Sequence, residues 1–393
     1  MSDKPDLPLH LDAGSPVQAI PTDREGRTIE HGMALCLSGG GYRAMVFHIG
    51  VIWRLYETGL LRDLKRISSV SGGSITAGVL ALKWNEVTAP GVSDRKILER
   101  EFVTPLRQLA EETIDASAIV LGVALPGRIS DRIASAYEKH LFRGATLQDL
   151  PDVPRFVINA TNVQSGALWR FMKPYMADYR VGIVDGPSIP LSQAVAASSA
   201  FPPVLSPLEL RLDPGSFRPG SGLDLQRKPF TSRVILTDGG VYDNLGLETA
   251  WKRYDTILVS DGGGKLEAEE EPKSDWAQHS YRVLNLIDNQ VRSLRKRQVI
   301  DSFKADPKDA NHRNGAYWGI RTNIADYRLV DALDCPHDRT LALAATPTRL
   351  KRIQDTLQER LINWGYAVCD AALRKHLKEG LGPKPAFPYS GGV

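Results

Sequence analysis

Apolar runs and glycine-marked turns alternate along the first part of the chain and predict a repeated strand–turn–helix unit. Met33–Leu37 is a short apolar run of the kind that forms a buried strand, and three glycines follow at 39–41. Apolar residues spaced three or four apart over 46–56 then predict a helix. A second run, Ile67–Val70, leads through a serine and two glycines into a helix predicted over 75–84. This alternation predicts an α/β fold with a mostly parallel central sheet between two layers of helices.

Four further strands are predicted from β-branched and apolar runs, at Arg155–Thr161, Ala167–Phe171, Arg233–Thr237 and Thr256–Ser260. The first two are separated by a Ser-Gly turn, which predicts that they pair. Each of the last two ends in an aspartate followed by glycines, at Asp238 and Asp261.

The distribution of proline, glycine and helical patterns suggests one large domain with two polar ends. Residues 1–31 read as an extended lead-in and residues 381–393 as a loose tail. Between them, 32–380 read as a single α/β domain. It carries a helical insertion at about 92–150 and a helical C-terminal part at about 275–380.

Two apolar patterns allow either a structural or a membrane-facing interpretation. We expect the run Ala118–Pro126 to be a buried helix or cap, with an acyl-chain or membrane-facing surface as the alternative. The long helix predicted over 276–303 has an apolar stripe and an opposite, cationic side. We expect these cations to form a solvated face, and a membrane-surface role is the alternative. The stripe comprises Val283, Ile287, Val291 and Leu294, and the cations are Arg292, Arg295, Lys296 and Arg297.

Composition excludes several classes of protein. Over 393 residues, 42% are hydrophobic and 24% charged, as in a globular protein, and the net charge of +3 argues against a nucleic-acid binder. Cys36, Cys335 and Cys369 are few and far apart, so we expect neither disulfides nor a zinc site. The first twenty residues lack an apolar signal core, and no apolar run is long enough to span a bilayer. We therefore expect a cytoplasmic protein that needs no metal or other cofactor and contacts membranes only peripherally.

Ser71 is the candidate nucleophile. It directly follows an apolar strand and precedes Gly72 and Gly73, so a sharp strand-to-helix turn would expose its hydroxyl at the positive end of a helix. Centring the turn on Ser74 instead would place β-branched Thr76 where the helix must lie close to the strand. The structural alternative is a serine that only caps the helix.

Gly39, Gly40 and Gly41 are candidate oxyanion-hole residues. Backbone N–H groups at the start of a helix can receive the negative charge that acyl transfer places on a carbonyl oxygen. A phosphate cradle is the rival interpretation, but neither the dinucleotide nor the nucleotide-loop pattern is complete. Arg43 is expected to fix this loop or to face an anionic head group, with a surface ion pair as the plain alternative.

Asp238 is a candidate general base, because Gly239 and Gly240 leave room for a serine hydroxyl beside it. Asp261 has the same local setting, and local pattern alone does not choose between them. Serine hydrolases usually use histidine, but none of the downstream histidines follows an obvious core strand, and His48 lies on the helix after the glycine loop.

Taken together, these motifs resemble the patatin-like phospholipases, which are related to cytosolic phospholipase A2. The resemblance rests on Ser38–Arg43, Ser69–Gly73 and Asp238–Gly240, in the family's order, and on a further similar segment, Ala197–Pro202. It implies a three-layer α/β/α fold and a Ser71–Asp238 dyad that works without histidine. It also implies an oxyanion hole at Gly39–Gly41. Ser69 stands where the family usually has glycine.

The resemblance implies a lipid acyl hydrolase of the phospholipase A type, acting on phospholipids or other acyl esters at a transiently contacted membrane surface. Two alternatives remain open. One is a Ser-His-Asp esterase on a related fold, and the other is a catalytically silent regulator that binds membranes. Such a hydrolase is sometimes held inactive until an activator arrives, and the sequence shows no site for one.

Overall fold

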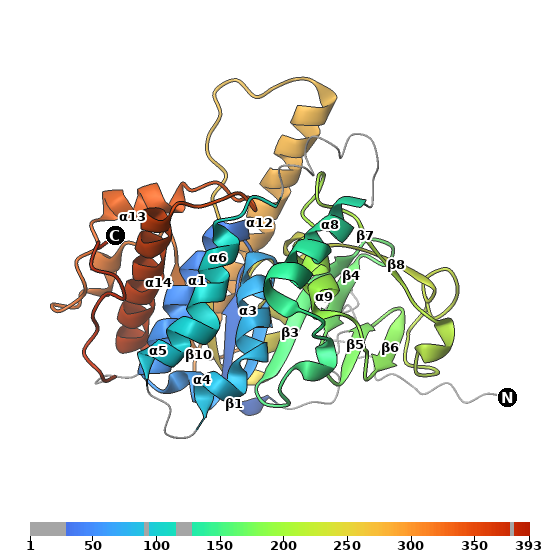
Figure 1. Ribbon diagram of the computed structural model, residues 1–393, viewed down its shortest axis with the longest axis horizontal. Helices are drawn as coiled ribbons and strands as arrows, with labels where there is room; N and C mark the ends of the chain where they lie inside the picture. Colours follow the sequence, from blue (N-terminus) through green and yellow to red (C-terminus); the bar gives the residue numbers. More distant parts are fainter. Residues whose placement is uncertain (1–28, 90–93, 115–127, 378–380) are drawn as a thin grey trace.

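A ten-stranded mixed sheet runs through the molecule, with its neighbours in the order β10-β9-β1-β2-β3-β4-β5-β6 and with β7 and β8 attached beside β3 (Figure 1). The computed structural model describes residues 29–89, 94–114, 128–377 and 381–393. The strands are β1 (Glu30–Leu37), β2 (Leu64–Ser69), β3 (Arg155–Asn162), β4 (Ala167–Phe171), β5 (Tyr175–Asp178), β6 (Gly182–Asp185), β7 (Leu208–Arg211), β8 (Arg233–Asp238), β9 (Tyr254–Asp261) and β10 (Asn314–Gly319). From β10 to β3 all pairings are parallel, and the remaining pairings are antiparallel. The predicted α/β class and the predicted pairing of β3 with β4 are confirmed.

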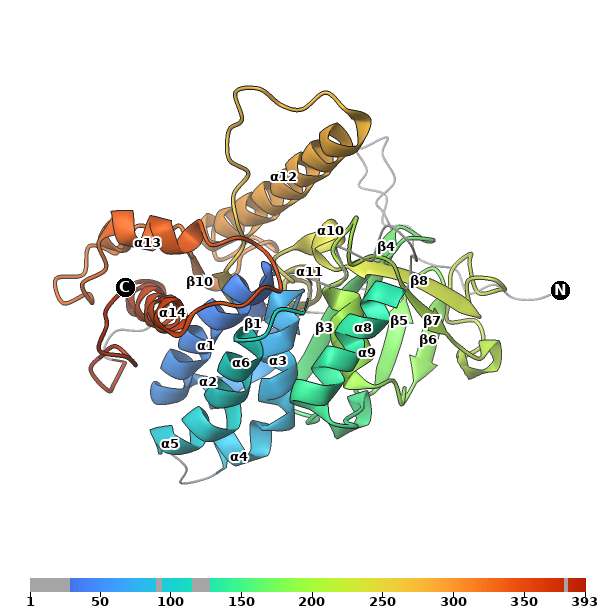
Figure 2. The same ribbon diagram turned by 45° about the horizontal axis from the view of Figure 1, so that its top comes forward.

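Helices cover both faces of the parallel half (Figures 1 and 2). The longer helices are α1 (Gly41–Glu57), α3 (Gly72–Leu82), α6 (Thr104–Ala110), α8 (Arg128–Tyr137), α9 (Leu191–Ser198), α12 (Trp276–Lys304), α13 (His337–Ala344) and α14 (Asp355–His376). Short helices are α2 (Leu60–Asp63), α4 (Trp84–Thr88), α5 (Arg95–Leu98), α10 (Gly240–Asp243) and α11 (Glu248–Trp251). The run Ala118–Pro126 lies outside the described residues, within 115–127.

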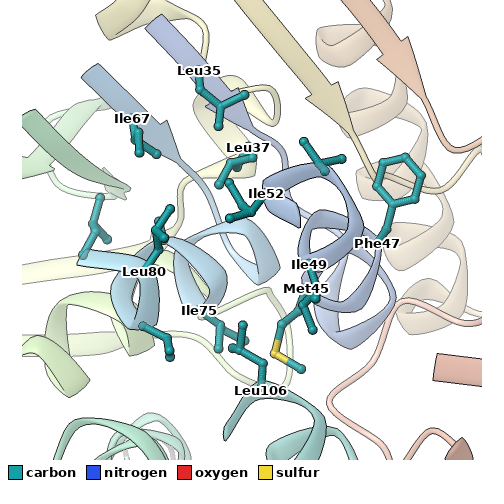
Figure 3. Packing of buried hydrophobic residues seen from close by; sticks show 14 of the residues in the cluster. Leu35, Leu37, Met45, Phe47, Ile49, Ile52, Ile67, Ile75, Leu80 and Leu106 are labelled. Atoms are coloured by element: carbon teal, nitrogen blue, oxygen red, sulfur yellow. The ribbon is translucent and has the colours of Figure 1, made fainter. Parts of the chain in front are cut away.

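The period-two alternation of β1 divides the core between the two layers. Leu35 and Leu37 face one side and pack with α1, α3 and α14 in the larger apolar cluster (Figure 3). Ala34 and Cys36 face the other side, where they join a smaller cluster with residues of α11 and with Val299 near the end of α12. The central strand is therefore buried on both faces, as its unbroken apolar run predicts.

The orientation of α12 differs from the expected one. Val283, Ile287 and Leu294 are exposed. The cations opposite them contact the body of the protein: Arg295 pairs with Glu248 at 2.9 Å, and the Lys296 ammonium lies 4.6 Å from the centre of the Tyr317 ring. The expectation of a solvated cationic face is therefore wrong for Arg295, because a carboxylate from a distant segment reaches it, whereas Lys296 and Arg297 are exposed.

The last residues are not loose. The Asn363 side chain of α14 donates hydrogen bonds of 2.8 Å to the carbonyl oxygens of Tyr389 and Gly392, and Val393 is buried. The Pro/Gly-rich composition predicted a loose tail, but the backbone oxygens of this segment accept hydrogen bonds from α14. Among the described helices, none combines the length and apolar character needed to cross a bilayer.

Candidate active site

Strands β2 and β8 meet end to end along the same side of β3, and this arrangement creates the site. In the β2–β3 ladder Ser69 lies opposite Ile158, and in the β3–β8 ladder Asp238 lies opposite Ala160. The two strands run in opposite directions, so their carboxyl ends approach each other. Asp238 therefore does not stand at the end of a parallel strand. Its strand is antiparallel, and its register on β3 carries the carboxylate to the turn that follows β2.

Ser71 occupies that turn in a strained backbone conformation. Its φ of 52° and ψ of −121° are unusual for a residue with a side chain, as at a nucleophile elbow. It stands at the N-cap position of α3, but its side chain makes no capping hydrogen bond, so the structural alternative of a helix-capping serine is not supported. At Gly73 a Cβ atom would lie 2.4 Å from the Leu37 carbonyl oxygen, so the turn can pack on β1 only with glycine there.

Three serines beneath the turn hold it in place. The Ser74 hydroxyl lies 3.0 Å from the Ser69 hydroxyl and 2.9 Å from that of Ser198, which also accepts the Ser71 amide at 3.0 Å. Ser69, at the position where the family usually has glycine, also donates to the Val157 carbonyl at 3.3 Å. Ser74 is fully buried in this network, which leaves Ser71 as the serine of the turn that lines the cavity.

Asp238 is almost completely buried, with 2% of its surface exposed. Burial raises its pKa from the usual 3.8 to about 7, against the opposing effects of a hydrogen bond from the Gly240 amide and of the Ser71 hydroxyl. The Gly240 amide donates to Oδ1 at 2.7 Å. Oδ2 has no partner among the described residues within the geometry of a formed hydrogen bond, although the Ser71 hydroxyl is close enough to influence the carboxylate. Such loose contacts are common in unliganded sites.

The segment at the end of α9 aligns the two candidate catalytic residues with each other. The Asp238 amide donates to the Ala200 carbonyl at 3.0 Å, and the Gly239 amide donates to the Ser198 carbonyl at 3.2 Å. Ser198 therefore holds both the Ser71 turn and the turn after β8. The sequence contains a signal for this segment, the Ala197–Pro202 resemblance, but local pattern does not reveal that it joins the two strand ends.

The glycine loop between β1 and α1 is only partly available as an anion site. The Gly39 amide is engaged, because it donates to both the backbone oxygen and the side-chain Oδ1 of Asn244, each at 3.0 Å. The amides of Gly40 and Gly41 make no hydrogen bond within the described part of the chain and lie at the start of α1, where the helix dipole is positive. Gly39 thus serves as an anchor, in contrast to its expected role as an oxyanion donor.

Asn244 and Asp288 are site residues that sequence reasoning missed. Asn244 Nδ2 donates to Asp288 Oδ1 at 3.2 Å, which connects the glycine loop to α12. Burial raises the pKa of Asp288, and its charge adds to the elevation of the Asp238 pKa. Helix α12, about forty residues after Asp238 in the chain, therefore contributes a polar wall with one carboxylate, which no local sequence motif predicts.

The other sequence candidates lie outside the cavity. Arg43 is buried and donates to the carbonyls of Gly262 and Thr346, so it braces the loop after β9. Asp261 is occupied by the Tyr317 hydroxyl at 2.7 Å and by the Gly263 amide at 2.9 Å. His48 is buried between the Ser260 hydroxyl and the Ser38 carbonyl, at 2.9 and 3.0 Å, and burial lowers its pKa to about 4.

Ser71, Asp238 and the glycine loop open into one cavity of about 660 Å³. One wall is apolar, with Phe201, Val204 and Leu205 among its residues, and another is the polar side of α12. None of the described histidines lines it. Within the described residues, no cluster of three or more histidine, cysteine or acidic residues is arranged to hold a metal ion. The cavity can accept an apolar chain beside a serine, a proton acceptor and two free amides.

Comparisons with known proteins agree with this architecture. A family model described as patatin-like phospholipase matches residues 35–251. Human GIVD cytosolic phospholipase A2 superposes with a TM-score of 0.50 at 13% identity, over 88% of this chain and 61% of that one. The same human enzyme in complex with methyl gamma-linolenyl fluorophosphonate gives 0.50 at 15% identity, over 87% and 57%. The chain thus spans about three-fifths of that protein's length, and identities this low show a shared fold. A search of curated proteins found no match.

Proposed function

Because the chain belongs to the patatin-like phospholipase family, we propose that it is a lipid acyl hydrolase in which Ser71 and Asp238 act as a catalytic dyad. The substrate would be a phospholipid, cleaved at a carboxylic ester in the manner of a phospholipase A. The end-to-end meeting of β2 and β8 carries this proposal, since it brings a strained serine and a carboxylate with a pKa of about 7 into one cavity.

In the first half-reaction the Ser71 oxygen attacks the ester carbonyl carbon, and the hydroxyl proton passes to Oδ2 of Asp238. A pKa near 7 suits this transfer, because the carboxylate is still ionised near neutral pH yet basic enough to hold the proton. The tetrahedral intermediate then collapses, and the departing lysophospholipid alkoxide takes the proton from Asp238. The acyl group remains on Ser71.

In the second half-reaction water attacks the acyl-enzyme and Asp238 again accepts the proton. The fatty acid leaves, and the proton returns to the Ser71 oxygen. In both steps the negative carbonyl oxygen is assigned to the amides of Gly40 and Gly41, which have no other partner in the described chain. Donors of this kind typically contribute about 10²–10³ each to the rate.

The alternative of a Ser-His-Asp esterase has less support, because His48 is held between other groups and no described histidine reaches the cavity. The alternative of a silent regulator has less support as well. A strained serine beside a buried carboxylate whose Oδ2 has no partner among the described residues is costly to maintain without a chemical role.

The test is hydrolysis of a soluble fluorogenic acyl ester and of phospholipid by wild type, Ser71→Ala and Asp238→Asn, with the released lipids measured by mass spectrometry. We expect both variants to lose at least about 10³-fold in kcat. Ser135→Ala, at an exposed serine of α8 away from the cavity, is the control and keeps wild-type activity. A fluorophosphonate probe should label Ser71 alone. Full activity in Ser71→Ala would overturn the proposal.

A further inference from the structure

Helix α12 has its polar side toward the protein and its apolar side toward solvent. The side lining the cavity carries Asn285, Asp288, Asn289 and Arg292. The opposite side carries large apolar residues with exposed fractions between 41% and 83%. We call this surface the α12 apolar face, formed by Trp276, Val283, Leu286, Ile287 and Leu294. This arrangement is the reverse of that in an ordinary surface helix.

The α12 apolar face is continuous. Trp276, Val283, Ile287 and Leu294 follow one another at spacings of seven, four and seven residues, so they lie along one side of the helix for about 27 Å. The N-terminal part of α12 projects from the body of the molecule (Figure 2). Within the part of the chain that the structure describes, no element packs on this face, which is therefore free to meet a flat surface.

Charge on and around the helix narrows the choice of partner. From Trp276 to Arg297 the only carboxylate on α12 is Asp288, which lines the cavity on the other side of the helix. Near the projecting end, exposed Glu270 and Glu271 follow Glu269, which pairs with Arg282. Exposed Lys273 lies on the same segment, and Lys296 and Arg297 are exposed toward the other end of the helix. Charges of both signs therefore surround the α12 apolar face, and neither sign dominates enough to select a strongly charged partner. The partner therefore has to be apolar with uncharged or zwitterionic polar groups at its edge.

We propose that the α12 apolar face docks on a zwitterionic phospholipid bilayer. This inference rests on the proposed function, since it is the lipid substrate that makes a bilayer the relevant partner. Tyr281 lies between the cavity and solvent, because it lines the cavity and is also 46% exposed. Tryptophan and tyrosine favour the boundary between head groups and acyl chains, and Trp276 is the most exposed aromatic of the helix. Aliphatic side chains beside them would enter the outer acyl layer.

The experiment measures co-sedimentation of the full-length Ser71→Ala protein with phosphatidylcholine vesicles, so that binding is separated from hydrolysis. Into this background we introduce Val283→Ser, Ile287→Ser and Leu294→Ser together. The matched control carries Val153→Ser, Val163→Ser and Val330→Ser, which remove three exposed valines elsewhere. We expect the α12 triple variant to lose vesicle affinity by at least about tenfold and the control to bind like its parent. Binding of the parent should persist in 0.5 M NaCl, about the level at which surface charges are screened.

Further measurements separate the ways in which the inference could fail. The α12 triple variant with Ser71 intact should hydrolyse a soluble short-chain ester at the wild-type rate and melt at the wild-type temperature. Unchanged vesicle binding in the triple variant would overturn the docking surface while leaving the proposed function intact. The inference would also be overturned if the wild type were a dimer and the triple variant a monomer that still binds vesicles. The partner of the α12 apolar face would then be a second copy of the chain. Soluble-ester activity surviving in Ser71→Ala would instead refute the proposed function.

Discussion

Replacing Asp238 with asparagine should make the protein more stable and at the same time inactive. The substitution keeps the shape of the side chain. Its Oδ1 can still accept the Gly240 amide, and Nδ2 takes the place of an oxygen without a formed hydrogen bond. The wild-type carboxylate, by contrast, must ionise in a buried site, and the folded state opposes that ionisation.

The magnitude follows from the pKa. A folded-state value of about 7 against the usual 3.8 is a shift of about three units, or about 4 kcal/mol. Below pH about 4 the carboxyl is protonated in both folded and unfolded chains, and ionisation has no effect on stability. Between pH about 4 and about 7 only the unfolded chain loses the proton, so wild-type stability falls as pH rises. Above pH about 7 the full penalty of about 4 kcal/mol is present.

The assay is thermal unfolding of wild type and Asp238→Asn from pH 4 to pH 9. With an unfolding entropy of about 2.1 cal/mol/K per residue, 4 kcal/mol corresponds to about 5 °C for a chain of this length. We expect the variant's advantage in Tm to be small near pH 4 and to reach about 5 °C above pH 7. Wild-type kcat/KM should rise with an apparent pKa near 7 over the same interval. Asp301→Asn, at an exposed carboxylate of α12, is the control. A Tm difference that does not change with pH would refute the assignment of Asp238 as a buried carboxylate with a raised pKa.

Three further predictions address the residues around the dyad. Asn244→Ala removes the Oδ1 that accepts the Gly39 amide and the side-chain amide that binds Asp288, while the backbone oxygen at position 244 still accepts the Gly39 amide. It should lower kcat by about tenfold while KM stays near its wild-type value; an equal change in KM would contradict a positioning role. Gly73→Ala places a methyl group against the Leu37 carbonyl and should destabilise the protein by about 1–3 kcal/mol or prevent folding, measured by urea unfolding and soluble yield. An unchanged unfolding midpoint would contradict the close packing of the turn. Asp261→Asn should keep kcat within about threefold of wild type in the soluble-ester assay, since its carboxylate lies outside the cavity; a loss comparable to that of Asp238→Asn would make Asp261 the base.

The turn at Ser71 could be predicted from sequence because the residues that form it are consecutive in the chain. The apolar run of β2, the serine and the two glycines specify a strand, a sharp turn and a helix start, and these are local properties. The glycine loop at the end of β1 was located for the same reason. Local sequence could not show which of its amides stay free. The acceptor that engages the Gly39 amide is Asn244, about two hundred residues away in the chain.

The choice between Asp238 and Asp261 needed the fold or the family resemblance, because both aspartates end apolar strands before glycines. Sequence pattern marks a strand and its end, but it does not state the strand's neighbours or direction. The register of β8 on β3 puts Asp238 beside Ser71, whereas β9 lies on the other side of β1 and brings Asp261 to Tyr317.

Short stretches of sequence were enough to predict most helices and strands, and the turns that carry the candidate site residues. These features depend on hydrophobic periodicity, residue propensity and backbone flexibility, which are local properties. Contacts between distant segments determine which side chains lie next to each other and which surfaces are exposed, and these appear only in the folded protein. The apolar stripe of α12 predicted a helix correctly, yet it faces outward because distant segments supply partners for the polar side. Pairing, register and burial are properties of contacts between segments far apart in the chain, and they decide both how Asp238 reaches Ser71 and what α12 leaves exposed.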